Sequence, residues 1–397
     1  MDTAMFNRWH ARRLCAYLFC GCLLMVVLGC TIESPDAPTG TPPLATAEPP
    51  VTRLPPTPHP TDTATVQVRT VVTDEVRELG SLPNPPTVRG RDGGSSGVLG
   101  GQMLWTFGDT IFTKPNEQGA GGIANSAALA PLDDPTAITA TLDAAGAPVP
   151  LLPYTEEETR YNQAHGNRGD DRLALWPAEV VALADRSALV FYQKLAIHPG
   201  AFNFEALAVG LARIAPGSTV AQRDPGVLFA KPEPLFTDGA VVKGDQLYLY
   251  ACAPAGQLDS ACKVGRVARA QAGERGAYRF WNGSAWVMDA TQATPVLRGP
   301  TSGVSVAWNS YLGQYLAVYS GIVSSKVLLR TAPQPEGPWS TPVVAFAGEP
   351  AAQGQWDYAG REHPELAQEG GKILYVSYYR PLKGLQGELR LVQLRLK

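Results

Sequence analysis

A hairpin pattern recurs five times in this 397-residue chain. Each copy has an apolar run, a short polar turn and a second run rich in aliphatic and aromatic residues, and further strand-like runs follow it. Equivalent positions in the second runs are Leu104, Leu189, Leu247, Tyr315 and Leu374. Four strands per copy, arranged radially, is the pattern of a β-propeller. The repeat therefore predicts an all-β, five-bladed β-propeller with four-stranded antiparallel blades over residues 67–397.

Composition and charge agree with this prediction. The 40 glycines and 35 prolines fall between short apolar runs, as expected for a chain with many turns. The early run VQVRTVVTDEVRELG is predicted to complete the last blade, because an open propeller would expose sheet edges. A net charge of −3 without a basic block argues against a nucleic-acid partner.

Residues 1–30 have the pattern of a lipoprotein signal peptide. Basic residues precede an apolar run from Leu14 to Leu28, and the run ends at Cys30. This end resembles a bacterial lipobox, which predicts lipidation of Cys30 and a membrane contact through a lipid anchor. The alternative is a single transmembrane anchor, for which the run is short. Either interpretation predicts an extracytoplasmic, membrane-anchored protein.

Two further features concern the segments outside the hairpins. Residues 31–66 are rich in Pro, Thr and Ala and are predicted to form a disordered tether, because they cannot bury enough apolar surface to fold. Cys252 and Cys262 flank a short polar segment whose length suits a disulfide across a hairpin, with two buried thiols as the alternative. A disulfide requires an oxidising compartment.

The first hairpin brings two acidic residues together. Gly100-Gly101 predicts a two-residue turn, so that paired residue numbers add up to 201 and Asp92 lies opposite Asp109. Opposite residues in an antiparallel pair have their Cβ atoms about 4.5–5.5 Å apart. Two carboxylates that close are stable only if a ligand binds them or one holds a proton. The structural alternative is that each aspartate simply stabilises a turn, in RDGG and FGDT respectively.

The open ends of the five hairpins are expected to converge around one axis. The candidate substrate-binding residues at these ends are Trp176, Glu179, Asp238, Ser305, His363, Glu365, Tyr378 and Arg380. Paired carboxyl groups with aromatic faces are what cleavage of a glycosidic bond needs, since one carboxyl protonates the leaving oxygen and the other attacks or activates water. Taken singly, each of these residues also fits a solvated strand, a turn or a packing role.

The sequence lacks the motifs of other enzyme classes. The five histidines have no metal-ligand spacing, and neither a GxSxG elbow nor a phosphate loop occurs. We therefore expect neither a catalytic metal nor a cofactor. A structural Ca²⁺ in the channel stays open as an alternative, since carboxylates and carbonyls suffice for it.

Five motifs resemble one bacterial family. They are FGDT, NSAAL at 125–129, SVAWNSYLGQYLAVY at 305–319, LLRTAPQPEGPWS at 328–340, and HPEL with LYVSYYR near the end. The chain resembles the five-bladed propeller family DUF4185, some members of which are endo-D-arabinanases. The resemblance implies that the catalytic pair is Asp92 and Asp109. Asn125, in NSAAL, is taken as a further substrate-binding candidate.

The expected function is that of a surface-anchored, monomeric glycoside hydrolase that acts on a polysaccharide or cell-wall glycan. The resemblance implies an endo-acting arabinofuranosidase or D-arabinanase. A non-catalytic glycan-binding or adhesion propeller is the main alternative, and a structural envelope propeller is a third.

Overall fold

The computed structural model describes residues 71–165, 171–200, 203–257, 259–301, 303–352, 354–383 and 386–397. The predictions for Cys30, the signal peptide and the tether lie outside these residues. The chain divides into Met1–Thr63 and Ala64–Lys397, and the second unit contains the repeat. None of the helices in the described ranges has the length and apolar character needed to cross a membrane.

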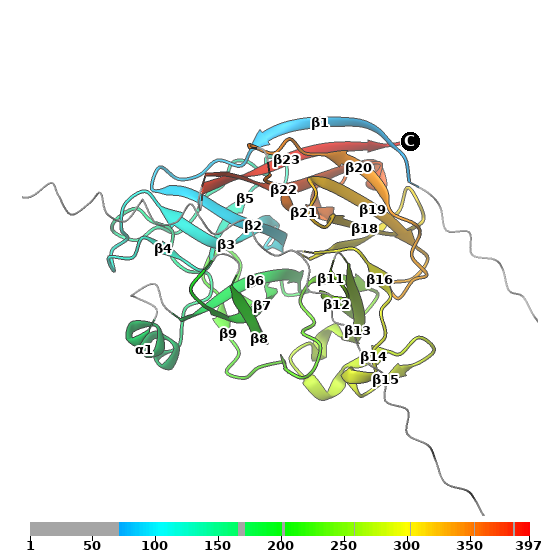
Figure 1. Ribbon diagram of the computed structural model, residues 1–397, viewed down its shortest axis with the longest axis horizontal. Coiled ribbons are helices and arrows are strands. Elements are labelled where there is room, and N and C mark those ends of the chain that lie inside the picture. The colour runs from blue at the N-terminus through cyan, green and yellow to red at the C-terminus, as the bar shows by residue number, and fades with distance from the viewer. Residues whose placement is uncertain are drawn as a thin grey trace, which may run out of the picture. The chain divides into compact units, whose positions relative to one another are not determined.

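The five hairpins form five antiparallel sheets, so the predicted five-bladed propeller is confirmed (Figure 1). Blade 1 contains β2 (Val88–Leu99), β3 (Gln102–Phe112), β4 (Gly122–Ile123) and β5 (Ser126–Ala130). Blade 2 contains β6 (Arg172–Ala182), β7 (Ala188–Ile197), β8 (Phe204–Ile214), β9 (Gln222–Arg223) and β10 (Phe229–Ala230). Blade 3 contains β11 (Gly239–Lys243), β12 (Gln246–Pro254), β13 (Ser260–Ala268), β14 (Arg279–Trp281), β15 (Trp286–Val287) and β16 (Leu297–Arg298).

The last two blades each have four strands. Blade 4 contains β17 (Ser305–Asn309), β18 (Gln314–Ser320), β19 (Lys326–Ala332) and β20 (Val343–Ala347). Blade 5 contains β21 (Tyr358–Glu362), β22 (Ile373–Lys383), β23 (Gln386–Leu396) and β1 (Thr73–Ser81). The helical elements are short: α1 (Glu156–Ala164) and the 3₁₀ turns η2 (Arg269–Gln271), η3 (Arg275–Ala277), η4 (Ala290–Gln292), η5 (Pro364–Leu366) and η6 (Glu369–Gly371).

The inner strands of the blades close into a ring. Strands β2, β6, β11, β17 and β21 contact one another in cyclic order, and β21 contacts β2. Close approach at the axis requires glycine, because a Cβ on Gly97 would lie 2.8 Å from the side chain of Val180. The first described strand, β1, pairs with β23 as the outer strand of blade 5, which is the predicted closure.

The core consists of layers between neighbouring blades. One layer packs Leu104 of blade 1 against Val190 of blade 2, and another packs Leu189 of blade 2 against Leu247 of blade 3. All five equivalent positions of the repeat are buried. The second strand of each blade has a neighbouring blade on both faces, which explains its nearly continuous apolar sequence.

The first hairpin departs from a regular ladder. The predicted pairing holds from Leu99 opposite Gln102 to Ser95 opposite Thr106, but Gly93 then pairs with Phe107. The prediction that Asp92 lies directly opposite Asp109 is therefore wrong in detail. The cause is an irregularity at Gly93 and Gly94, whose φ angles of +86° and +98° are accessible to glycine without strain.

Candidate active site

A cleft of about 1510 Å³ lies on the face where the open ends of the hairpins meet. Blades 1, 2, 3 and 5 contribute to its wall, together with Thr301 and Gly303 of the loop before β17. Among the lining residues are Asp92, Trp176, Phe204, Asp238, Trp356, Tyr358 and Arg361. The exposed fractions of Phe204 (45%) and Trp356 (39%) are large for aromatic side chains, so two aromatic surfaces face the solvent of the cleft.

Asp92 is the half-buried acid of the first hairpin and lines the cleft. Tyr358 donates a hydrogen bond from its hydroxyl to Oδ2 of Asp92 at 3.3 Å. Burial, together with the charge of Asp109, raises the pKa of Asp92 to about 7. Glycine is required opposite this carboxyl group, because a Cβ on Gly108 would lie 2.5 Å from Oδ1 of Asp92. The bulge thus turns the Asp92 side chain across the hairpin toward β3.

Asp109 has different partners. Trp176 donates from its indole nitrogen to Oδ1 of Asp109 at 3.3 Å, and the guanidinium of Arg172 lies 3.9 Å from the same oxygen. Burial raises the pKa of Asp109, while Arg172 and Trp176 oppose the rise. The side chain keeps 30% of its surface exposed. The two aspartates therefore interact electrostatically, but only Asp109 has a cation beside it.

A second group of charges surrounds Arg361. Its guanidinium forms an ion pair with Glu179, and both side chains are buried. Asp238 accepts hydrogen bonds from the backbone N–H of Cys252 at 2.7 Å and from Gln193 at 3.2 Å. Burial raises the pKa of Asp238 to about 7, and the charge of Glu179 adds to the rise. Glu179 and Asp238 were both predicted from the sequence, whereas Arg361 was not.

A smaller cavity of about 120 Å³ lies at the axis. Glu179, Ser305, Arg361, Glu362, His363 and Glu365 are among its lining residues. Ser305 accepts the backbone N–H of Glu362 at 2.7 Å and donates to the carbonyl of Val318, which is a structural role. Burial raises the pKa of Glu362 to about 8, and its Oε2 atom has no hydrogen-bond partner.

His363 belongs to a hydrogen-bonded chain beside this cavity. Its Nδ1 lies 2.6 Å from Oγ of Ser96, and its Nε2 lies 2.8 Å from Oγ of Ser377. Ser96 also donates to Glu365. Burial lowers the pKa of His363 to about 3, so the ring is neutral and holds blade 1 to blade 5. Predicted residues Glu179, Ser305, His363 and Glu365 thus gather at the axis, beside the cleft.

Asp109 of the predicted catalytic pair lines neither cavity itself, although its neighbour Gly108 and its partner Trp176 line the cleft. Three predicted substrate-binding residues also line neither cavity. Asn125 is fully buried, donates to the carbonyl of Leu175 at 3.0 Å and accepts the N–H of Leu152 at 2.7 Å. Tyr378 donates to Glu78 of β1 at 3.1 Å. Arg380 stands opposite Glu388 in the β22–β23 ladder. Their contacts therefore serve the fold.

Several site residues had no clear signal in the sequence. Arg172 and Tyr358 contact the aspartate pair from blades 2 and 5, which lie far from blade 1 in the sequence. Arg361 and Glu362 directly precede the HPEL motif, so their position next to His363 was the available signal.

The structure joins Cys252 and Cys262 in a disulfide between β12 and β13, beneath the cleft wall. Within the described ranges, no three or more His, Cys, Asp or Glu side chains are grouped so as to hold a metal ion.

Solved structures with a similar fold include several hydrolases. A candidate hydrolase from Bacteroides ovatus ATCC 8483 has a TM-score of 0.56 at 15% identity, covering 78% of this chain and 87% of that chain. The catalytic domain of the GH62 α-L-arabinofuranosidase from Coprinopsis cinerea has a TM-score of 0.46 at 11% identity, covering 80% of this chain and 96% of that chain. The GH43_1 enzyme from Xanthomonas citri has a TM-score of 0.44 at 14% identity, covering 80% and 90%. At these identities the likeness concerns the fold.

No curated protein matches the sequence. Residues 213–381, from the end of β8 into β22, match a family model, and this confirms the resemblance for the three motifs that lie within them. This part of the chain is thus similar to the family described as Domain of unknown function (DUF4185).

Proposed function

We propose that this protein is a glycoside hydrolase that cleaves a polysaccharide with Asp92 and Asp109. The observation that carries the proposal is the difference between the two carboxyl groups. Asp92 has a phenol as its side-chain partner and a pKa raised to about 7, whereas Asp109 lies beside Arg172 and the indole N–H of Trp176. Environments that separate two carboxyl groups in this way assign them acid and base roles.

In the proposed reaction Asp92 is the general acid. Its proton passes to the glycosidic oxygen as the bond between that oxygen and the anomeric carbon breaks. Asp109, whose ionised form Arg172 favours, either attacks the anomeric carbon or takes a proton from the water that attacks it. If Asp109 attacks, a water molecule deprotonated by Asp92 then cleaves the ester bond to Asp109, which restores both groups. If Asp109 acts as the base, it releases its new proton to solvent and Asp92 takes one up, so the pair recovers its single negative charge.

The cleft supports a polymeric substrate. Its aromatic side chains include Trp176, Phe204 and Trp356, which offer flat faces to sugar rings. The wall draws on blades 1, 2, 3 and 5, so a chain can extend beyond the aspartate pair. The resemblance to D-arabinanase members of the family favours an endo-acting enzyme on a furanoside polymer. Lipidation at Cys30 and the tether at 31–66 would place it at the cell surface, in contact with envelope glycan.

The test is hydrolysis of arabinan and other furanoside polymers, measured as new reducing ends. We expect Asp92→Asn and Asp109→Asn each to lose about 10²–10⁴-fold in kcat, the usual contribution of a positioned acid or base. Asp133→Asn, an exposed aspartate without an ionic partner among the described residues, is the matched control. Equal activity in all variants would reject the assignment. Retention of glycan without any product from the wild type would favour the glycan-binding alternative.

A further inference from the structure

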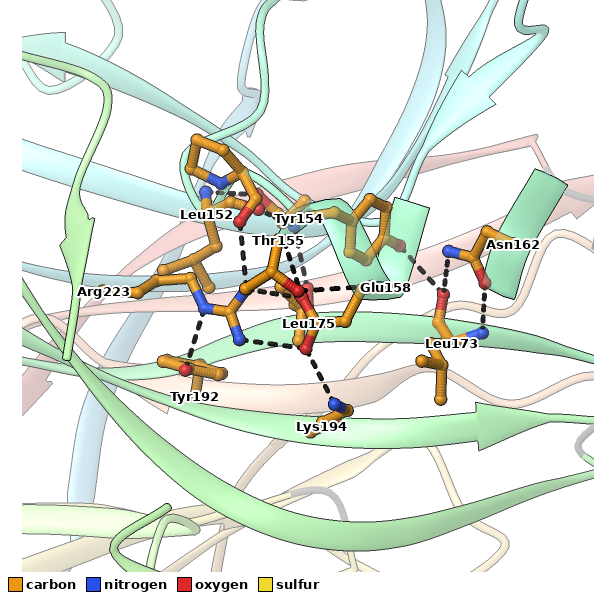
Figure 2. A network of polar contacts seen from close by, with 12 residues as sticks. Leu152, Tyr154, Thr155, Glu158, Asn162, Leu173, Leu175, Tyr192, Lys194 and Arg223 are labelled. Carbon is orange, nitrogen blue, oxygen red and sulfur yellow. Dashed lines mark hydrogen bonds and ion pairs between the residues drawn. The ribbon is translucent and has the colours of Figure 1, made fainter. Parts of the chain in front are cut away.

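The segment before β6 contains α1 and is tied to blade 2 by a network of polar contacts (Figure 2). We call Tyr154, Glu158 and Asn162 the α1 brace. Thr155 and Glu158 form a capping box at the start of α1, in which each side chain accepts the other's backbone N–H. The helix therefore begins at a fixed point on the blade.

Glu158 anchors this helix start to the sheet. Its carboxylate accepts hydrogen bonds from Arg223 of β9 at 2.6 and 3.1 Å and lies 2.8 Å from Nζ of Lys194 on β7. Burial opposes ionisation, but the bonds from Arg223 and Lys194 prevail and lower the pKa of Glu158 to about 2. Arg223 also donates to Tyr192 and to the carbonyl of Pro153, so one guanidinium joins the brace to two strands.

The other two members of the brace bind Leu173 of β6. Asn162 accepts the backbone N–H of Leu173 at 2.7 Å and donates to its carbonyl at 3.1 Å. Tyr154 donates to the same carbonyl at 2.9 Å. Because β6 is the edge strand of its sheet, this side of Leu173 has no strand partner. Asn162 supplies the pair of bonds that a neighbouring strand would make.

Leu173 lies between the two residues that contact Asp109. Arg172 precedes it directly, and Trp176 follows three residues later on the same strand. Strand ends fray when their backbone groups are unpaired. The contacts of Arg172 and Trp176 with Asp109 therefore depend on how firmly the start of β6 is held.

We propose that Asn162 and Tyr154 are positioning residues, which hold the start of β6 so that Arg172 stays beside Asp109. The proposal rests on the proposed function for its kinetic consequence, but not for its structural one. The groups that face Asp109 electrostatically are Arg172, Asp92 and the phenols of Tyr154, Tyr358 and Tyr379. The phenols are neutral below pH 8, so the charges that act on Asp109 are those of Arg172 and Asp92.

The first experiment needs no activity. It follows the ¹³C carboxyl signal of Asp109 in full-length protein labelled at aspartate, with Asp109→Asn to assign it. In Asn162→Ala we expect the apparent pKa of Asp109 to rise by about 0.5–1 unit, a fraction of the effect of a cation beside a carboxylate. Gln163→Ala, the exposed next residue on α1, is the matched control and should titrate like the wild type.

The second experiment tests whether Asn162 acts through Arg172. The pKa of Asp109 in Arg172→Gln should equal that in the Arg172→Gln/Asn162→Ala double variant, because the contact to be held is already gone. Full additivity of the two shifts, or an unchanged titration in Asn162→Ala, would overturn the proposal. If Asn162→Ala does not fold, Tyr154→Phe removes one bond from the same carbonyl and takes its place.

Kinetics add an independent readout. On a furanoside polymer, Asn162→Ala should move the acid limb of the kcat profile to higher pH while KM stays unchanged, and Gln163→Ala should move neither. If no polymer is cleaved by the wild type but the carboxyl shift persists, the proposed function falls and the positioning role stands. If cleavage occurs and neither the limb nor the carboxyl signal moves, the positioning role falls.

Discussion

Asp92 and Asp109 carry the same side chain on one hairpin and face different surroundings. Asp92 points toward a phenol of blade 5, while Asp109 meets a guanidinium and an indole of blade 2. Neither difference is encoded within the hairpin. The charge that Asp109 retains helps to keep the proton on Asp92, so the two groups function as a unit.

The hydroxyl of Tyr358 affects the pKa of Asp92 within this pair. Its hydrogen bond favours the ionised form of Asp92 and lowers a pKa that burial has raised. In Tyr358→Phe we expect the pKa of Asp92 to rise by up to about one unit. Because Asp92 is the proposed acid, the alkaline limb of kcat/KM should move to higher pH. Tyr311→Phe, at an exposed tyrosine, is the control, and an unmoved limb in Tyr358→Phe would contradict the assigned role.

At the scale of strands and turns, the five-fold hairpin pattern was sufficient to predict the fold, because each second strand lies between two blades and is nearly continuous in apolar sequence. It could not reveal side-chain direction. The irregularity at Gly93 and Gly94 turns the Asp92 side chain toward Gly108. A register shift between Pro177 and Glu179 likewise changes the direction of side chains on β6.

Residue type alone also misled at some positions. Asn125 and Tyr378 belong to motifs of the family, yet their polar atoms bind backbone groups or a strand of blade 5. The helix α1 had a usable signal, since Thr155 and Glu158 have the spacing of a capping box. Its contact with Leu173 had none, because Asn162 meets the edge of β6 only in the folded ring.

Strand β1 offers a test of the ring closure. Glu78 of β1 accepts hydrogen bonds from Tyr378 of β22 and Arg390 of β23, both at 3.1 Å. In Glu78→Ala we expect the free energy of unfolding to fall by about 1–2 kcal/mol, since the buried hydroxyl of Tyr378 loses its partner. Glu75→Ala, on the same strand and without such a contact, should change it by less than about 0.5 kcal/mol. Urea unfolding measures both, and equal effects would refute the role of Glu78.

Over the whole molecule, partial or full burial in the ring raises the pKa values of several acids. The pKa values of Asp92 and Asp238 are raised to about 7 and that of Glu362 to about 8. A carboxyl group whose pKa is higher in the folded than in the unfolded chain stabilises the fold while it is protonated. This stabilisation is lost as the pH rises through the pKa of the folded state. His363, which is neutral when buried, has the opposite effect on the pH dependence of stability. It acts below a pH of about 6.5, the pKa of histidine in the unfolded chain.

Stability should therefore fall as the pH rises from 6.5 to 8, where His363 no longer contributes to the slope. Glu362→Gln should flatten this fall, and the difference from the wild type should grow by about 1–2 kcal/mol over the interval. Chemical denaturation at several pH values measures the slope. Glu349→Gln, at an exposed glutamate, is the control, and parallel curves for Glu362→Gln and the wild type would show that Glu362 is ionised throughout.

Strand β1 closes the ring by pairing with β23. The first described residues, Val71 and Val72, contact the propeller and lead into this strand, which is held by its ladder with β23. Tension applied through the N-terminal segment would load that ladder before any contact of blade 1. Because Asp92 lies on β2, the next strand in the chain, the β1–β23 ladder is the element that would separate such a pull from the aspartate pair.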